Sequence, residues 1–512
     1  MNEIVTAELL PSDVADAELL ARVRPPVWAN PIPASRYNLV VVGAGTAGLV
    51  TAAGAAALGA KVALVERSLL GGDCLNVGCV PSKALLRSAR FCADVANAAQ
   101  FTGSARAPSA VDFAAAMRRM RRLRAHLGRL DSVQRFHDLG VDVFLGEATF
   151  LDRRRIAVAG AVLEFRKAVI ATGARAAHPP IDGLEEAGYL TNETVFNLTE
   201  RPRRLLVIGG GPLGCELAQA FARLGCEVII ASREPYFLSG EERDAAEILA
   251  HALRHDGIAV RLNTEVVSAT RGNGAKCVRL RNYDQDETVT VDEILVGAGR
   301  VPNVDGLNLE AAGVEYDRER GVRVDDHMQT TNRRIYAAGD VALDTKYSHM
   351  AEATARIVIR NALFWGRKKL SSLTIPWCTY TDPEIAHVGV YVQDAHRRGF
   401  SMKTFTVPMS DVDRAVLDGE DEGFVKIHVR DGTDTILGAT IVAHHAGEMV
   451  NEISLAMVAG IGLKTLSQVI HSYPTQAEAI RQAGEAYDRT RLTPLLRTIS
   501  GRWLAWSRGS KG

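Results

Sequence analysis

The 512-residue sequence has few cysteines, and those it has are scattered. Seven cysteines are too sparse for a small disulfide scaffold, and no two of them have the spacing of a zinc site. We therefore expect a reducing compartment and no metal site. Their positions are Cys74, Cys79, Cys92, Cys215, Cys226, Cys277 and Cys378.

Net charge and long apolar runs are also absent. Lys plus Arg and Asp plus Glu number 60 each, which gives no global attraction for nucleic acid or an anionic membrane. No run reaches the ~18 apolar residues of a membrane span, and residues 1–36 lack the basic start and apolar core of a secretory signal. We expect a cytoplasmic protein of roughly three domains, with a small molecule as substrate and neither nucleic acid nor membrane as partner.

What the sequence does contain is a close cysteine pair, Cys74 and Cys79, in the segment 71–90. The residues that follow favour a helix, whose N-terminal dipole stabilises a thiolate. Positions five apart on a regular helix lie roughly 8 to 9 Å apart, too far for a disulfide. We therefore expect a distorted helix, broken at Gly78 and Pro81, and a readily reduced disulfide. The alternative is two buried cysteines in an apolar helix start.

Residues 37–66 have the pattern of a dinucleotide-binding unit, in which an apolar strand, a glycine-rich turn and an Ala-rich helix lead to a second strand. Gly43 allows the tight turn, Gly45 admits a pyrophosphate, and Gly48 packs the helix on the strand. Glu66 closes the second strand, where an acid bonds a ribose hydroxyl.

A second such unit begins with an apolar strand followed by Gly209, Gly211 and Gly214. Two units imply two dinucleotides. At the end of its second strand, where an acid would select the ribose of NAD, stand Ser232 and Arg233. This exchange favours the 2′-phosphate of NADP(H), although Arg233 could be an ordinary exposed arginine and NAD(H) stays open.

Residues 107–130 predict a basic amphipathic helix. It could be a patch for anions or nucleic acid, but with zero net charge we favour a solvated helix face.

The string from Gly71 to Lys83, Gly-Gly-Asp-Cys-Leu-Asn-Val-Gly-Cys-Val-Pro-Ser-Lys, resembles the active-site segment of the flavin-dependent pyridine nucleotide-disulfide oxidoreductases. The resemblance covers residues 37–495 almost continuously. It implies an α/β fold with two Rossmann-like dinucleotide-binding domains and an α+β dimerisation domain. The expected parts are an N-terminal extension (1–36), an FAD-binding domain in two parts (37–186 and 306–369), an NAD(P)-binding domain (187–305), a dimerisation domain (370–495) and a tail (496–512).

The resemblance also implies roles. The first dinucleotide unit would hold FAD, Cys79 would lie nearer the flavin, and Cys74 would exchange with substrate. Lys83 would pair with Glu216 beside the flavin, and two subunits would form a homodimer. Further cofactor contacts are expected from Thr172, Gly173, Gly299, Gly339 and Asp340, the last of these near the ribityl chain.

The sequence departs from the family where most members have His-Pro-Thr-x-x-Glu, with the histidine serving the partner subunit's thiols. Here Tyr473 stands in that place while Glu478 is kept, and His471 matches an earlier histidine that is either structural or a replacement base. A tyrosine titrates near ~10, so it is a poor base at neutral pH but a usable proton donor.

Mercuric reductase is similar in carrying this tyrosine, but its N-terminal Cys-x-x-Cys domain and C-terminal cysteine pair have no counterpart in this sequence. We therefore expect an FAD-dependent reductase that passes electrons from NADPH through Cys74 and Cys79 to a disulfide or a thiol-bound acceptor, Hg(II) among the candidates. A dihydrolipoyl dehydrogenase and a flavin-binding redox sensor without turnover are the alternatives.

Overall fold

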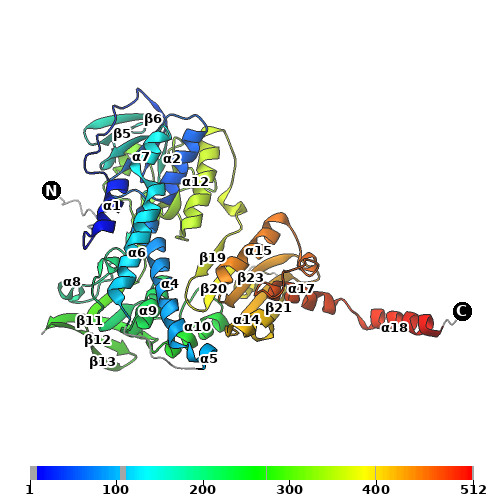
Figure 1. Ribbon diagram of the computed structural model, residues 1–512. Helices are drawn as coiled ribbons and strands as arrows, with labels where there is room; N and C mark the ends of the chain where they lie inside the picture. The colour runs from blue at the N-terminus through cyan, green and yellow to red at the C-terminus, as the bar shows by residue number, and fades with distance from the viewer. Residues whose placement is uncertain (1–8, 104–110, 273, 398, 400, 510–512) are drawn as a thin grey trace. The chain divides into compact units, whose positions relative to one another are not determined.

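The computed structural model describes residues 9–103, 111–272, 274–397, 399 and 401–509. They fold as two compact units (Figure 1), of which the first holds the chain up to residue 237 and residues 253–373, and the second holds residues 238–252 and the chain from 374 onward. Within these described ranges no helix is both long and apolar enough to cross a membrane.

The first unit contains a seven-stranded sheet in the order β3-β2-β1-β6-β5-β4, with β18 paired to β6. β6 is shared between two ladders, because its second half runs parallel with β1 and β18 whereas its first half is antiparallel to β5. All five residues of β2 are buried, as a near-continuous apolar run predicts for a parallel strand covered on both faces. The strands are β1 (Tyr37–Val42), β2 (Val62–Glu66), β3 (Asp142–Leu145), β4 (Ala148–Phe150), β5 (Arg155–Val158), β6 (Ala161–Ile170) and β18 (Ile335–Ala337).

Helices α2 (Thr46–Ala57) and α12 (Ser348–Leu363) pack side by side in this unit (Figure 1). A Cβ at Gly54 of α2 would lie 2.7 Å from Cδ1 of Ile359, so the small residue permits this close approach. The unit's other helices are α1 (Val14–Val23), α3 (Gly72–Asn76), α4 (Cys79–Ala96), α5 (Ala99–Thr102), α6 (Phe113–Gly128), α7 (Val133–Asp138), α8 (Leu184–Ala187), α9 (Pro212–Arg223) and α11 (Leu309–Ala312).

A parallel four-stranded sheet, ordered β10-β9-β8-β14, forms the second dinucleotide unit, and a three-stranded antiparallel sheet, β11-β12-β13, is inserted in the chain between β10 and β14. Two-stranded pairs, β7 with β15 and β16 with β17, complete the unit. The bounds are β7 (Ala174–Ala176), β8 (Arg204–Ile208), β9 (Glu227–Ala231), β10 (Ala259–Arg261), β11 (Thr264–Gly272), β12 (Ala275–Asn282), β13 (Gln285–Val291), β14 (Glu293–Val296), β15 (Arg300–Pro302), β16 (Tyr316–Asp317) and β17 (Gly321–Val322).

The second unit is built on a five-stranded antiparallel sheet in the order β19-β20-β23-β22-β21. The predicted alternation of strands and apolar helices is confirmed here, and one core joins the sheet to α15 and α17. The strands are β19 (Pro376–Thr379), β20 (Glu384–Gly389), β21 (Met402–Pro408), β22 (Phe424–Arg430) and β23 (Ile436–Ala443). The helices are α13 (Val392–Arg397), α14 (Asp413–Asp418), α15 (Ala446–Ala459), α16 (Leu463–Leu466), α17 (Glu478–Thr490) and α18 (Pro494–Gly509), while α10 (Arg243–His255) is divided between the units.

The basic helix predicted over 107–130 is α6, which begins at Phe113, and residues 107–110 lie outside the described ranges. The expectation of a solvated face is wrong for two of its arginines. Arg121 and Arg124 are buried, because α1 packs on this face of α6 and supplies carboxylates to both. A count of net charge cannot show that an arginine has a buried partner.

Candidate active site

The cysteine pair lies where two helices meet. Cys74 is in the five-residue helix α3, and Cys79 is the first residue of α4. The predicted break is present at Gly78, whose Cβ would lie 2.8 Å from the carbonyl oxygen of Asp73. The second predicted break is wrong, because Pro81 lies inside the first turn of α4, where the missing N–H of a proline costs no hydrogen bond.

The two sulfurs are present as a dithiol and differ in acidity. The Cys74 thiol donates a hydrogen bond to Cys79, and this bond, helped by the Ser348 hydroxyl and the charge of Lys83, lowers the pKa of Cys79 to about 6. The same bond, together with burial, raises the pKa of Cys74. The pair therefore holds one proton near neutral pH, on Cys74, and carries its negative charge on Cys79.

Ser348 is a site residue that sequence reasoning missed. It is the first residue of α12, and its Oγ lies 3.2 Å from Sγ of Cys79. Cys79 therefore stands at the N-terminus of its own helix and beside the N-terminus of α12, and both helix dipoles favour a thiolate. The only signal in the sequence was a serine shortly after Asp340, which periodicity alone does not connect to a cysteine 269 residues away.

The ion pair expected between Lys83 and Glu216 is present, with Nζ 2.7 Å from Oε2. Lys83 lies one helical turn beyond Cys79 on α4, and Glu216 is buried on α9 of the second dinucleotide unit. The pair lowers the Cys79 pKa through Lys83 and opposes that effect through Glu216.

The turn after β1 is shaped as the glycine motif requires. Gly43 has φ of +101°, and a Cβ there would lie 2.4 Å from the carbonyl oxygen of Ala171. A Cβ at Gly48 would lie 1.8 Å from the carbonyl oxygen of Gly43, so only glycine lets α2 pack this closely on the turn. Gly45 caps the N-terminus of α2, whose free N–H groups suit a phosphate.

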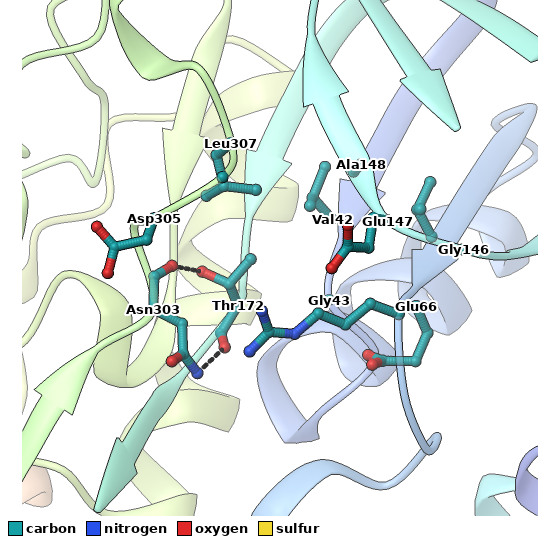
Figure 2. Close-up of a pocket in the computed structure, with 13 residues that line it drawn as sticks. Val42, Gly43, Glu66, Gly146, Glu147, Ala148, Thr172, Asn303, Asp305 and Leu307 are labelled. Atoms are coloured by element: carbon teal, nitrogen blue, oxygen red, sulfur yellow. Dashed lines mark hydrogen bonds between the residues drawn. The ribbon is translucent and has the colours of Figure 1, made fainter. Parts of the chain in front are cut away.

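Glu66 lies at the carboxyl end of β2, and its two oxygens accept hydrogen bonds from the backbone N–H groups of Ala44 and Ser68, each at 2.7 Å. Burial raises the pKa of this carboxyl group, and the two backbone bonds oppose that effect. Each carboxylate oxygen can accept a second hydrogen bond. Glu66 lines the cavity of Figure 2, so its carboxylate can accept a hydrogen bond from a ribose hydroxyl bound there.

Thr172 and Asn303 form one wall of that cavity (Figure 2). The Thr172 hydroxyl donates to the Asn303 carbonyl at 2.7 Å, and the Asn303 side-chain amide donates to the Thr172 carbonyl at 2.9 Å. These reciprocal bonds join the segment that follows β15 to the turn after β6. The remaining wall includes Gly146, Glu147 and Ala148.

Arg300 is a second residue for which the sequence predicted no role. It forms an ion pair with Asp73 beside Cys74, donates to the Ala174 carbonyl at 2.7 Å, and lies 3.7 Å from Asp340. Burial raises the pKa of Asp340 and the charge of Arg300 lowers it, with a net rise. The neighbouring predicted residues Gly299 and Gly339 have φ of +110° and +75°, which glycine adopts freely.

Three cavities of the first unit adjoin one another and lead from Glu66 to the cysteine pair. The one in Figure 2 shares Glu66 and Thr172 with a second, and the second shares Gly45 and Asp73 with a third, which contains both cysteines and Ser348. The buried Oδ1 of Asn76, a residue lining the second cavity, has no hydrogen-bond partner within the described chain. The glycine cradle, the helix N-terminus and this acceptor are the groups that a flavin dinucleotide needs here.

The second dinucleotide unit repeats the geometry of the first. A Cβ at Gly214 would lie 2.1 Å from the carbonyl oxygen of Gly209, and Gly211 caps α9. Ser232 is buried, and its Oγ accepts from the N–H of Glu234 at 3.3 Å. Arg233 is exposed at the end of β9.

The segment that departs from the family lies in the second unit. The Tyr473 hydroxyl donates to Asp413 at 2.7 Å, and this bond raises the Tyr473 pKa above its ordinary value. Glu478 pairs with Arg481 at 2.6 Å, and Nε2 of His471 lies 3.2 Å from Glu452. A tyrosine that holds its proton more tightly is not a base, and the buried His471 ring has an acidic partner of its own.

Family models match most of the chain. The model described as pyridine nucleotide-disulphide oxidoreductase covers residues 37–356, and the model of that family's dimerisation domain covers residues 375–484. The mercuric reductase of Staphylococcus aureus is 34% identical over 88% of this chain and 83% of its own length. The dihydrolipoyl dehydrogenase of Thermus scotoductus is 34% identical over 88% of this chain and 97% of its own length.

Two solved structures illustrate the shared fold. The HOCl-induced flavoprotein disulfide reductase RclA of Escherichia coli superposes with a TM-score of 0.79 at 28% identity, covering 88% of this chain and 99% of RclA. LpdA of Mycobacterium tuberculosis superposes with a TM-score of 0.79 at 27% identity, with the same coverage of 88% and 99%. The chain belongs to the pyridine nucleotide-disulphide oxidoreductase family, whose members use FAD and a nicotinamide nucleotide.

Proposed function

We propose that the protein is an NADPH-driven flavoprotein reductase that passes two electrons through Cys74 and Cys79 to a disulfide or to a metal ion held by thiols. The observation that carries this proposal is the place of Cys74 and Cys79, which line one cavity with Ser348 and lie at the junction of α3 and α4. Bound FAD would accept a hydride from the nicotinamide and return its electrons to the cysteine disulfide. Gly43, Gly45, Glu66 and Asp340 would hold FAD.

The dithiol supplies the exchange chemistry. Transfer of the shared proton from Cys74 to Cys79 leaves a Cys74 thiolate, which attacks one sulfur of the acceptor disulfide and releases the other as a thiolate that takes up a proton. Cys79 then gives up its proton, attacks Cys74 and releases the second thiol. One NADPH, one proton and one disulfide thus yield NADP⁺ and two thiols.

This internal proton transfer bears on the missing histidine. In the family that histidine serves the thiols, and here Tyr473 stands in its place with a raised pKa. Because Cys74 holds the proton more tightly than Cys79, this internal transfer is uphill, so a pair without the histidine should exchange with a disulfide more slowly. We propose Tyr473 as a proton donor to the leaving thiolate and Glu478, which pairs with Arg481, as a second residue of the site, both acting on the partner subunit of a homodimer.

Mercury is the second acceptor that we propose, because relatives named mercuric reductases are 34% and 32% identical over 88% and 95% of this chain. Hg(II) is soft and binds thiolates in pairs, so Cys74 and Cys79 could receive it. Thiol-bound Hg(II) with one NADPH and one proton would give Hg(0), NADP⁺ and two thiols. RclA has been solved as a Cu(II) complex, which makes copper a further ion to test.

The test is the rate of NADPH oxidation by the purified FAD-bound protein with small disulfides, lipoamide, and Hg(II) or Cu(II) in excess thiol. Turnover that needs both cysteines and favours a disulfide or a metal ion over lipoamide supports the proposal. Rapid, reversible turnover with lipoamide would identify a dihydrolipoyl dehydrogenase. Two-electron reduction without turnover on any acceptor would identify a redox sensor.

A further inference from the structure

Residues ahead of the first dinucleotide unit form helix α1, which is docked on α6. Leu19 and Val23 of α1 are fully buried. A Cβ at Gly128 of α6 would lie 2.5 Å from Cδ1 of Leu19, so this glycine lets the two helices approach. Helix α1 is thus packed into the hydrophobic core of the first unit.

A buried ion pair links α1 to the helix that carries Cys74. Asp16 and Arg124 are both fully buried, and their side chains are 2.7 Å apart. Arg124 also donates to the carbonyl oxygen of Asn76 at 2.8 Å. Asn76 is the last residue of α3, two positions after Cys74.

The other end of α3 is held by the same elements. The Asn76 side-chain amide donates to the carbonyls of Gly72 at 2.8 Å and Leu70 at 3.1 Å, and the Leu70 N–H donates to the Val23 carbonyl at 3.2 Å. A helix of five residues has little stability of its own. Its place, and that of Cys74, is therefore set by these contacts.

We propose that α1 is a positioning element of the redox centre, in which Asp16 fixes Arg124 and Arg124 fixes the Cys74 helix through the Asn76 carbonyl. The proposal rests on the proposed function insofar as Cys74 is the exchanging thiol. Asp16 and Arg124 are positioning residues and contact no substrate. Sulfur-to-sulfur attack depends on alignment, and a displacement of ~1 Å can change a rate by about 100-fold.

Asp16→Asn tests this inference, with Asp13→Asn as its matched control. Asp13 lies on the same helix interface and pairs with Arg121 at 2.7 Å, and an asparagine there keeps the N-cap. The measurement is the alkylation rate of Cys74 in the reduced protein, read by mass spectrometry with Cys92 as internal reference, and the equilibrium of the pair with a small dithiol. Asp16→Asn should change the Cys74 rate by about 10-fold or more, and Asp13→Asn should not.

A double variant covers the case in which Asp16→Asn does not fold. Asp16→Leu with Arg124→Met replaces the buried pair by apolar groups, an exchange that proteins tolerate, yet it removes the donor to Asn76. Its melting temperature should stay near that of the wild type while Cys74 reactivity changes. Wild-type Cys74 reactivity and redox equilibrium in a folded variant would overturn the proposal. Failure of the proposed function is a different result, in which Cys74→Ser retains turnover.

A second, independent observation concerns α18, which lies beyond the family match that ends at residue 484. No residue of α18 is buried. Leu495, Ile499, Trp503 and Trp506 recur at spacings of three and four and therefore form one exposed apolar stripe along the helix. From Arg489 to Gly512 the sequence has five arginines, one lysine and no acidic residue.

We infer that α18 binds the surface of an anionic lipid membrane, with its tryptophan stripe in the interface and its arginines toward the headgroups. Amphipathic helices that bind at the membrane interface typically carry tryptophan on the apolar face and arginine or lysine on the polar face. The prediction of no membrane partner considered the zero net charge of the whole chain, whereas anionic lipid attracts a local cluster of basic residues within a Debye length.

Sedimentation of the full-length FAD-bound protein with vesicles tests this inference. The protein should bind vesicles of phosphatidylglycerol and phosphatidylcholine, should not bind phosphatidylcholine alone, and should dissociate in high salt. Trp503→Ser should weaken binding about 10-fold or more, since it removes most of one large apolar group from the interface, while Leu504→Ser, on the opposite helix face, should not. Equal binding by both variants would overturn the inference. So would an absence of binding together with a change of oligomer mass in Trp503→Ser, which would show that a second copy covers the stripe.

Discussion

The sulfur of Cys79 lies 3.2 Å from the hydroxyl oxygen of Ser348, so the first turn of α12 stabilises the thiolate at the start of α4. The two residues come from opposite ends of the first unit's chain. Their contact joins the cysteine pair to the strand-to-helix connection that contains Asp340. The Ser348 hydroxyl is thereby a neutral hydrogen-bond donor beside the negatively charged sulfur of Cys79.

Ser348→Ala should raise the Cys79 pKa from about 6. A hydrogen bond to a charged group contributes ~1.5 to 3 kcal/mol, or about one to two pKa units. Because the thiolate is the reactive form, the alkylation rate of Cys79 should rise with pH around this pKa, and the variant's profile should shift to higher pH. Ser82→Ala is the control, since the Ser82 hydroxyl bonds the Cys79 carbonyl and not the sulfur. Superimposable profiles for wild type and Ser348→Ala would remove Ser348 from the site.

Lys83→Met and Glu216→Gln should shift the same profile in opposite directions. The Lys83 charge lowers the Cys79 pKa and the Glu216 charge raises it, so loss of Lys83 makes the thiolate less stable and loss of Glu216 makes it more stable. The measurement is again the pH dependence of Cys79 alkylation. A shift in the same direction for both variants would show that the pair acts through structure rather than charge.

Arg233→Ala should remove most of a preference for NADPH. An arginine contact to the 2′-phosphate contributes ~1.5 to 3 kcal/mol, or roughly 10- to 150-fold in affinity. Nucleotide KM values with NADPH and NADH measure this effect. Arg203→Ala is the control, since Arg203 precedes β8 at the end of the sheet away from the nucleotide. Equal use of the two nucleotides by the wild type would refute the assignment.

Tyr473→Phe should slow turnover while leaving Cys79 alkylation unchanged, because the proposed role is donation of a proton to the leaving thiolate. A subunit with Cys74→Ser mixed with a Tyr473→Phe subunit should recover part of the activity if each site is shared across a two-fold dimer. Asp413→Asn should lower the Tyr473 pKa, since it removes the carboxylate charge that raises it. An active monomer in sedimentation would contradict the shared site.

Mercury should be a slow, readily inhibiting substrate of this chain. No cysteine follows Cys378 in the sequence, so Hg(II) has to pass from external thiols directly to Cys74 and Cys79, where two thiolates hold it tightly. NADPH oxidation should stall and recover partly with excess small thiol. Fast, sustained release of Hg(0) without inhibition would favour mercuric reductase as the main activity.

Local patterns predicted most of the fold. The strands and glycine turns of both dinucleotide units follow from apolar runs and glycine spacing, and the predicted order of strand, turn, helix and strand over residues 37–66 is present as β1, α2 and β2. The break at Gly78 also followed from spacing, because two cysteines five apart cannot bond across a regular helix. Pro81 was misread because a proline in the first turn does not interrupt a helix.

Long-range pairing is what the sequence did not reveal. Ser348, Arg300 and the Asp16–Arg124 pair join segments that are more than a hundred residues apart. Each is a polar group that meets its partner only in the folded chain, and neither hydrophobic periodicity nor motif spacing in the sequence identifies that partner. The Lys83–Glu216 pair was predicted only because a resemblance supplied its partner.

The most direct test of the central claim is anaerobic titration of the FAD-bound protein with NADPH, followed by alkylation and mass spectrometry. One equivalent of NADPH per subunit should make Cys74 and Cys79 alkylatable together. A long-wavelength absorption band from the Cys79 thiolate beside the flavin should appear with them, be lost in Cys79→Ser, and be present before reduction in Cys74→Ser. Reduction of the flavin with both cysteines still joined as a disulfide, or a band that survives Cys79→Ser, would contradict the central claim.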